Sequence, residues 1–127
     1  MLELKLMPGK GRGTVATQPI PQGTVMEIAP VGAFPAEQRA TVDQTDIFEY
    51  YFVRPPEYNQ GKHVSGYIVF GLSSLSNHAE QPNARLEWVE DEVGLWAHFV
   101  ALEDIAHGEE VTVFYTNIDE YDTEKFV

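Results

Sequence analysis

The sequence predicts a mainly β domain with one short helix. Short runs rich in β-branched, aromatic or alternating apolar residues recur along the chain, and Gly or Pro turns separate them. A single stretch, residues 35–46, favours a helix. With 127 residues, of which 43% are hydrophobic, the chain is long enough for one core and too short for two. We therefore expect one domain over residues 1–127.

The first strand is predicted from alternation at the N-terminus, where Glu3 and Lys5 separate Leu2, Leu4 and Leu6. Such alternation is typical of a strand that is buried on one face. The same pattern, together with β-branched and aromatic content, predicts the other strands. They are expected at residues 14–17, 24–28, 47–53, 67–70, 86–89 and 95–100. The last two flank an acidic turn that ends in Gly94, which predicts a β-hairpin.

Glycine and proline separate the first strands. Residues 8–13, Pro-Gly-Lys-Gly-Arg-Gly, predict a turn whose backbone can approach a ligand closely. No helix pattern and no Gly-Lys-Ser/Thr ending follow, so a dinucleotide fingerprint and a phosphate loop are excluded. Taken alone, the segment indicates a hairpin turn. Residues 101–108 repeat the pattern of residues 16–23, with a strand end, an isoleucine and then a glycine turn.

The helix is predicted at residues 35–46, because Pro35 suits the first helical position and Ala36–Ala40 favour helix. The aromatic run at residues 47–53 then predicts a strand. Residues 54–62 are polar and carry two prolines, which predicts a loop.

The composition excludes several classes of function. Acids outnumber bases by 20 to 8, and the net charge of −12 argues against a nucleic acid partner. An acidic surface favours a cationic partner such as a lysine-rich protein segment, although it also serves solubility alone. The absence of cysteine excludes thiol catalysis, cysteine-ligated zinc and disulfides. No apolar run approaches the roughly 20 residues of a membrane helix, and the N-terminus does not resemble a signal peptide.

Residues 76–84, Ser-Asn-His-Ala-Glu-Gln-Pro-Asn-Ala, lie between two strand-like segments. The polar groups of Asn77 and His78 must be satisfied if they are buried, and Pro82 interrupts regular structure. Because such a segment costs folding energy, it indicates a functional site. The alternative is a loop in which Asn and His only close turns.

Three segments in order resemble the SET-domain protein-lysine methyltransferase family. Residues 10–16, Lys-Gly-Arg-Gly-Thr-Val-Ala, resemble its G-x-G turn, and Asn77–Asn83 resemble its N-H-S-x-x-P-N signature. Residues 101–115 resemble its A-x-x-D-I-x-x-G-E-E-x-T-x-x-Y element. The resemblance covers a core at about residues 9–116 and leaves residues 117–127 as a C-terminal tail. No cysteine-rich segment follows, as in compact, minimal members.

The resemblance implies a SET-domain fold of several small β-sheets with a C-terminal pseudoknot, in which the segment around Asn77 passes through or beside a loop formed by the C-terminal element. It also implies S-adenosyl-L-methionine as cofactor and a lysine side chain of a protein as methyl acceptor. The implied site residues are Tyr115 as the catalytic residue, Lys10, Gly11, Arg12, Gly13, Asn77 and His78 for cofactor binding, and Tyr51 and Val113 in the substrate channel.

These residue types suit methyl transfer from a sulfonium to an amine, which is an in-line displacement that mainly requires positioning. The hydroxyl of Tyr115 can orient the amine or the methyl group through weak hydrogen bonds. An aromatic channel disfavours the ammonium form of lysine, so the amine loses its proton before attack.

The chain departs from the family pattern at four positions. Ala79 replaces a serine, Glu80 a frequent cysteine, and Phe114 an aspartate. Val113 stands where many members carry an aromatic residue that limits the number of methyl groups. The smaller side chain predicts products beyond monomethyllysine.

Two other hypotheses belong to different classes. One is a catalytically silent SET-like module that binds proteins, which Ala79, Phe114 and the missing channel cover favour. The other is a metal hydrolase, but the four histidines show no ligand spacing, so we expect no metal site. The expected partner is a lysine-bearing basic protein, histone-like or other, with no direct nucleic acid and no membrane. A homodimer is also expected to be possible, since a second subunit would cover the channel. The expected location is cytoplasmic or otherwise intracellular, and nuclear in a eukaryote.

Without a cysteine-rich segment, Tyr121 or Phe126 is expected to cover the channel. Deleting residues 117–127 should therefore weaken cofactor binding, which isothermal titration calorimetry measures directly. Unchanged affinity in the shortened chain would show that the cover lies elsewhere.

Overall fold

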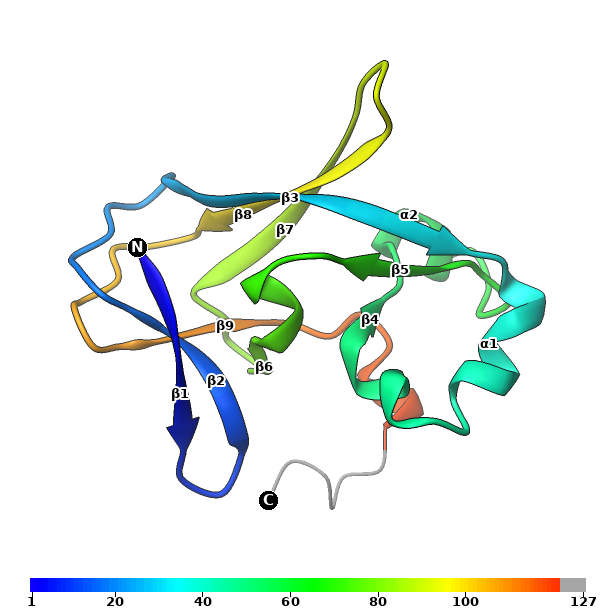
Figure 1. The fold of residues 1–127 in the computed structure, drawn as a ribbon, viewed down its shortest axis with the longest axis horizontal. Helices are drawn as coiled ribbons and strands as arrows, with labels where there is room; N and C mark the ends of the chain where they lie inside the picture. Colours follow the sequence, from blue (N-terminus) through cyan, green and yellow to red (C-terminus); the bar gives the residue numbers. More distant parts are fainter. Residues whose placement is uncertain (122–127) are drawn as a thin grey trace.

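The computed structural model describes residues 1–121, and residues 122–127 lie outside the described part. The described strands form two sheets, which confirms the mainly β prediction (Figure 1). One sheet has the order β1 (Leu2–Met7), β2 (Gly11–Ala16), β9 (Glu110–Val113), β6 (Asn77–His78). The other has the order β4 (Tyr51–Phe52), β5 (Gly66–Val69), β3 (Val25–Phe34), β8 (Leu95–Ala101), β7 (Ala84–Glu90).

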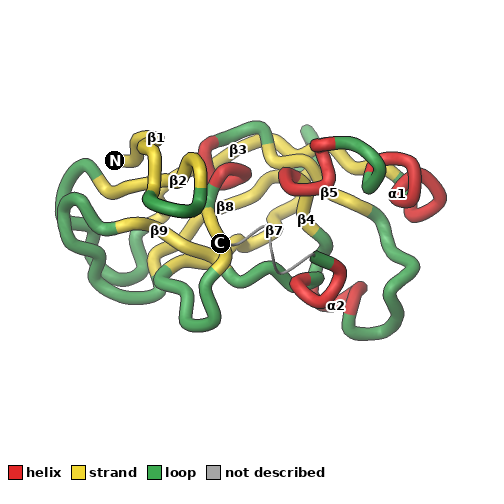
Figure 2. The backbone as a smooth tube through the Cα atoms, turned by 90° about the horizontal axis from the view of Figure 1, so that it is seen from below, coloured by secondary structure: helices red, strands yellow, loops and turns green. Residues whose placement is uncertain are grey.

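The helices are short, and all lie away from the N-terminal hairpin except the turn at Leu72–Leu75, which contacts β1 and β2. They are α1 (Ala36–Val42), α2 (Pro55–Tyr58) and the 3-10 turns η1 (Asp46–Tyr50), η2 (Leu72–Leu75) and η3 (Ile118–Glu120). Figure 2 shows α1 and α2 at the end of the molecule opposite to β1 and β2. Over residues 1–121, none of these helices has the length and apolar character that a membrane span requires.

The four-stranded sheet brings together segments that are far apart in the sequence. β2 pairs with β9 in antiparallel register, Thr14 opposite Val111. β6 lies on the other side of β9 and runs parallel to it, with Asn77 opposite Thr112 and His78 opposite Val113. The expected pseudoknotted arrangement is thus present, because the segment around Asn77 lies beside the C-terminal element and next to the N-terminal one.

The two turn segments that repeat each other in the sequence pair with each other in space. Ile20 and Ile105 exchange both backbone hydrogen bonds at 2.8 Å, and both side chains are buried in the same cluster. On one side of this bridge, Gly108 N–H donates to the carbonyl of Ala16 at 2.8 Å. The two segments that share this pattern therefore bind each other and join the N-terminal and C-terminal parts of the chain.

The predicted β7–β8 hairpin is confirmed, with Ala84 opposite Ala101 at its open end. β3 is longer than the predicted strand at residues 24–28 and continues through Pro30 to Phe34. Pro30 lies one residue outside the β3–β5 register, which begins at Val31, and there the missing N–H is tolerated. Its carbonyl still accepts a hydrogen bond from Phe70 N–H at 3.0 Å.

The prediction of one strand over residues 47–53 was wrong in its first half. Residues 46–50 form η1, and only Tyr51 and Phe52 are extended. Thr45 starts the turn, since its hydroxyl accepts a hydrogen bond from Ile47 N–H at 3.2 Å. Phe48 and Tyr51 are both buried in one cluster, and their spacing of three fits a 3-10 turn rather than a strand.

The helix prediction is confirmed over Ala36–Val42, and the helix ends earlier than residue 46. A second short helix, α2, occupies part of the predicted loop at residues 54–62. Pro55 lies in its first turn, where the missing N–H costs nothing.

The buried hydroxyl of Thr14 ties β2 to the segment before β6. It lies 2.8 Å from the hydroxyl of Ser76 and donates to the carbonyl of Val111 at 3.1 Å. We expect Thr14→Val to lower the free energy of unfolding by about 2 kcal/mol, since Ser76 is left buried with an unsatisfied hydroxyl. Thr24→Val, which removes an exposed bond to Pro21, should cost less than about 1 kcal/mol. Urea denaturation compares them, and equal losses would contradict this role of Thr14.

Candidate active site

Tyr115 lies two residues after the end of β9 and is bonded at two points to residues 76–78, here called the Asn-His segment. Its hydroxyl donates a hydrogen bond to the carbonyl of Ser76 at 2.7 Å. Its backbone N–H donates to Nδ1 of His78 at 3.0 Å. Nδ1 is therefore an acceptor, which leaves Nε2 as the nitrogen that carries the proton in neutral imidazole. The sequence placed these residues in one site, and the structure brings them together.

The phenol of Tyr115 stays protonated. Burial raises its pKa most, and the negative charges of Glu49 and Glu110 raise the pKa further. A neutral hydroxyl that already donates to Ser76 still presents oxygen lone pairs as acceptors. Tyr115 therefore offers a fixed, neutral oxygen rather than a base.

A polar cavity of about 230 Å³ lies beside Tyr115. Four of the six residues predicted to bind cofactor are on its wall, and the remaining lining comes from η1, η2 and the C-terminal segment. The lining residues are Lys10, Gly11, Arg12, Glu49, Tyr50, Ser74, Leu75, Asn77, Tyr115 and Tyr121. The N-terminal turn, the Asn-His segment and the tyrosine thus share one cavity.

Glu110 links the three predicted motifs, a role that sequence reasoning missed. Its Oε2 accepts a hydrogen bond from Asn77 Nδ2 at 2.7 Å, and its Oε1 accepts one from Lys10 Nζ at 3.1 Å. Its neighbour Glu109 accepts a hydrogen bond from Ala106 N–H at 2.9 Å and so stabilises the turn before β9. The sequence offered no signal to tell the pair apart, except that alternate strand residues face opposite ways.

Gly13 and His78 lie next to the polar cavity rather than on its wall. A Cβ on Gly13 would lie 2.7 Å from Met7 Cγ and 2.8 Å from Asn77 Nδ2. Gly13 therefore lets the hairpin pack beneath the Asn77 amide. The ring of His78 packs against Phe114 and Tyr115, with centroids 4.9 Å and 5.3 Å apart.

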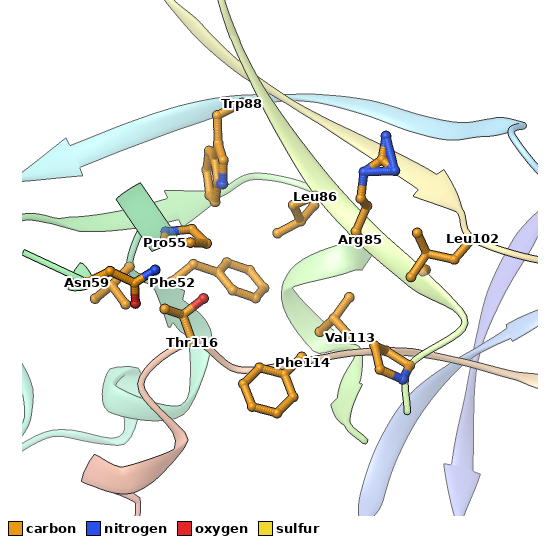
Figure 3. A pocket seen from close by; sticks show the side chains of 13 residues that line it. Phe52, Pro55, Asn59, Arg85, Leu86, Trp88, Leu102, Val113, Phe114 and Thr116 are labelled. Carbon is orange, nitrogen blue, oxygen red and sulfur yellow. The ribbon is translucent and has the colours of Figure 1, made fainter. Parts of the chain in front are cut away.

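A second, apolar cavity of about 420 Å³ lies on the other side of the strand end (Figure 3). Phe52 and Trp88 both lie on its wall, where their rings meet edge to face with centroids 6.2 Å apart. Val113, Phe114 and Thr116 contribute to this cavity, whereas Tyr115 between them lines the polar one. Its remaining lining residues are Val53, Pro55, Asn59, Pro82, Ala84, Arg85, Leu86 and Leu102.

Tyr51, predicted in the substrate channel, lies on the wall of neither cavity. It is 2% exposed, and its hydroxyl donates to Asp43 Oδ1 at 2.6 Å and accepts from Arg39 Nε at 3.1 Å. Its neighbour Tyr50 lines the polar cavity instead. The resemblance implied Tyr51 in the channel, but the unexpected 3-10 turn brings Tyr50 to the cavity wall and buries Tyr51.

The start of the C-terminal tail packs onto the domain as far as it is described. Tyr121 lines the polar cavity, and its ring lies 5.2 Å from that of Tyr115. The buried Arg39 holds this segment through an ion pair to Glu120 at 2.5 Å, and Lys62 pairs with Asp119. Phe126, the other predicted cover, lies outside the described residues.

The SET domain model matches residues 11–116 of the chain. This protein belongs to the SET-domain family. A histone-lysine N-methyltransferase of Schizosaccharomyces pombe, specific for H3 lysine-37, is 33% identical over 114 residues, which are 90% of this chain and 72% of that protein.

Solved structures show the same fold at lower identity. A candidate histone methyltransferase of Plasmodium falciparum superposes with a TM-score of 0.68 and 19% identity, covering 90% of this chain and 91% of its own. The Neurospora histone lysine methyltransferase DIM-5, a SET-domain protein, gives a TM-score of 0.66 and 18% identity, covering 90% of this chain and 51% of its own. The SET-domain fold predicted from the three motifs is thus confirmed.

The ion pair of the buried Arg39 with Glu120 is expected to stabilise the domain. Arg39→Met should lower the free energy of unfolding by about 3 kcal/mol, because it leaves the partly buried Glu120 without its cation. Arg85→Met removes the exposed pair with Glu87 and should cost less than about 1 kcal/mol. Chemical denaturation gives both values. Similar losses in the two variants would contradict a structural role of the buried pair.

Proposed function

We propose that this SET-domain protein transfers a methyl group from S-adenosylmethionine to a lysine side chain of a basic protein substrate. Two similar proteins are named as histone lysine methyltransferases. The methyl donor, the protein substrate and the roles of the individual residues are proposed here for this chain. The observation that carries it is the position of Tyr115 between a polar and an apolar cavity.

The residues of the polar cavity fit the donor. Lys10 and Arg12 offer cationic groups for a carboxylate, and the amide of Asn77 offers a polar partner for an ammonium. Gly11, at φ +77°, turns the backbone beside the cavity with open space around its Cα. When bound, the cofactor supplies a methyl group on a positively charged sulfur.

The apolar cavity fits the acceptor lysine. Phe52, Trp88 and Val113 would surround its alkyl chain, and the aromatic faces attract its charged head on entry. Desolvation then favours the neutral amine, which is the form that attacks. The net charge of −12 attracts a basic protein, histone-like or other, to the surface.

Tyr115 would act by position. Its hydroxyl is directed by the 2.7 Å bond to Ser76, and its neutral oxygen accepts weak hydrogen bonds from the amine and the methyl group. The two cavities would hold the amine and the methyl donor in line on either side of Tyr115, and this alignment supplies most of the increase in the methyl transfer rate. The roles of Val113 in the channel and of Asn77 and His78 around the cofactor belong to the same proposal. The homodimer stays a prediction.

A catalytically silent binding module is the second candidate. Phe114 favours it, since its side chain is 45% exposed at the strand end and lies against His78. A module of this kind would bind a basic protein without turning over labelled donor.

Tyr115→Phe should lower the methyl transfer rate about 100-fold or more, because the oxygen that orients the reactants is lost. Transfer of label from S-adenosylmethionine to a lysine-rich protein pool measures the rate. Tyr58→Phe is the matched control, since Tyr58 is a buried tyrosine that lines neither cavity and loses its hydroxyl bond to Asp119. Full activity in Tyr115→Phe would contradict the catalytic role, and no label transfer by the native protein would favour the binding module.

Val113 leads to a prediction about the product. Because it is smaller than an aromatic residue, exhaustive turnover should give dimethyllysine or trimethyllysine in mass spectra. Val113→Phe should stop the reaction at monomethyllysine by filling the apolar cavity, whereas Leu102→Met, on the same wall, should leave the product unchanged. Only monomethyl product from the native protein would rule the idea out.

A further inference from the structure

The polar cavity contains an acid that neither the sequence motifs nor the proposed mechanism uses. Three of the described residues on its wall carry a full charge: Lys10, Arg12 and Glu49. Glu49 comes from η1, the turn that replaces the expected strand, and it enters the cavity beside Tyr50. It is therefore brought to the site by a feature of the fold and not by a family motif.

The carboxylate of Glu49 acts on the tyrosines that face it. After burial, its charge contributes most to raising the pKa of Tyr115, ahead of the charge of Glu110. It also raises the pKa of Tyr121, after burial and the neighbouring tyrosines. Glu49 and Tyr115 line the same cavity, so this carboxylate adds negative potential around the hydroxyl where the transferred methyl group would lie.

We propose that Glu49 is a specificity-determining residue that makes the polar cavity prefer the positively charged sulfonium of S-adenosylmethionine over the neutral thioether of S-adenosylhomocysteine. The inference rests on the proposed function. Both ligands carry the same carboxylate and ammonium, so the contacts of Lys10, Arg12 and Asn77 with those two groups are the same for both. They differ by the methyl group and by one positive charge at sulfur, and a nearby carboxylate attracts the charged ligand more strongly than the neutral one. Transfer of the methyl group removes that charge, so Glu49 no longer attracts the sulfur of the product, S-adenosylhomocysteine, and the product binds more weakly than the donor.

The test is calorimetric titration of the protein with each ligand, without substrate protein and independent of activity. The ratio of the Kd for S-adenosylhomocysteine to that for S-adenosylmethionine should fall about fivefold in Glu49→Gln, as expected for loss of one partly solvated charge pair. Sinefungin, which carries an ammonium in place of the sulfonium, should lose affinity as S-adenosylmethionine does. Asp46→Asn, an acid-to-amide change in the same turn but off the cavity wall, should leave the ratio within about twofold.

The outcomes separate this inference from the proposed function. Binding of both ligands with an unchanged ratio in Glu49→Gln would overturn the role of Glu49 and leave the methyltransferase proposal intact. Binding of neither ligand to the native protein would overturn both. If Glu49→Gln does not fold, the inference is tested on the native protein. Raising salt from about 0.05 M to about 0.5 M screens the attraction between Glu49 and the sulfonium, so the ratio of the two Kd values should fall. A ratio that does not respond to salt would contradict the inference.

Discussion

The double attachment of Tyr115 to the Asn-His segment is the interaction on which the rest of the site depends. Its hydroxyl is bonded to the carbonyl of Ser76 at 2.7 Å and its amide to Nδ1 of His78 at 3.0 Å. One bond reaches His78 in β6, which runs parallel to β9, and the other reaches Ser76 just before β6. They fix the tyrosine as a wall between two cavities of opposite character.

The sheet beneath Tyr115 satisfies the polar groups that this arrangement buries. Thr14 bonds to Ser76 from the opposite side, and Glu110 joins Asn77 to Lys10. Each of these contacts crosses from one motif to another, so the N-terminal turn, the Asn-His segment and the C-terminal strand hold one another in place. A network of this kind is rigid because breaking any one bond leaves a partner unsatisfied. The site therefore needs no separate scaffold.

The sequence predicted the strands and the three motifs well, since alternation, glycine turns and ordered signatures are local patterns. The pairing of Ile20 with Ile105 follows from a repeat that is visible in the sequence. Local sequence patterns did not predict which of Tyr50 and Tyr51 reaches the polar cavity. An aromatic run favours a strand, but the capping hydroxyl of Thr45 and the burial of Phe48 fold it into a 3-10 turn. That turn directs Tyr50 and Glu49, not Tyr51, into the polar cavity. Glu110 was missed for a related reason, since its partners are distant in sequence.

The central claim is that the methyl donor lies in the polar cavity and the lysine reaches it from the apolar one, with Tyr115 between them. The most direct measurement is a crystal structure with S-adenosylhomocysteine and a lysine-bearing peptide bound together. The account predicts the thioether sulfur in the cavity lined by Lys10, Asn77 and Tyr115, and the lysine nitrogen opposite it, next to Val113 and Phe52. Nucleoside density in the apolar cavity, or a lysine more than about 5 Å from the sulfur, would contradict it.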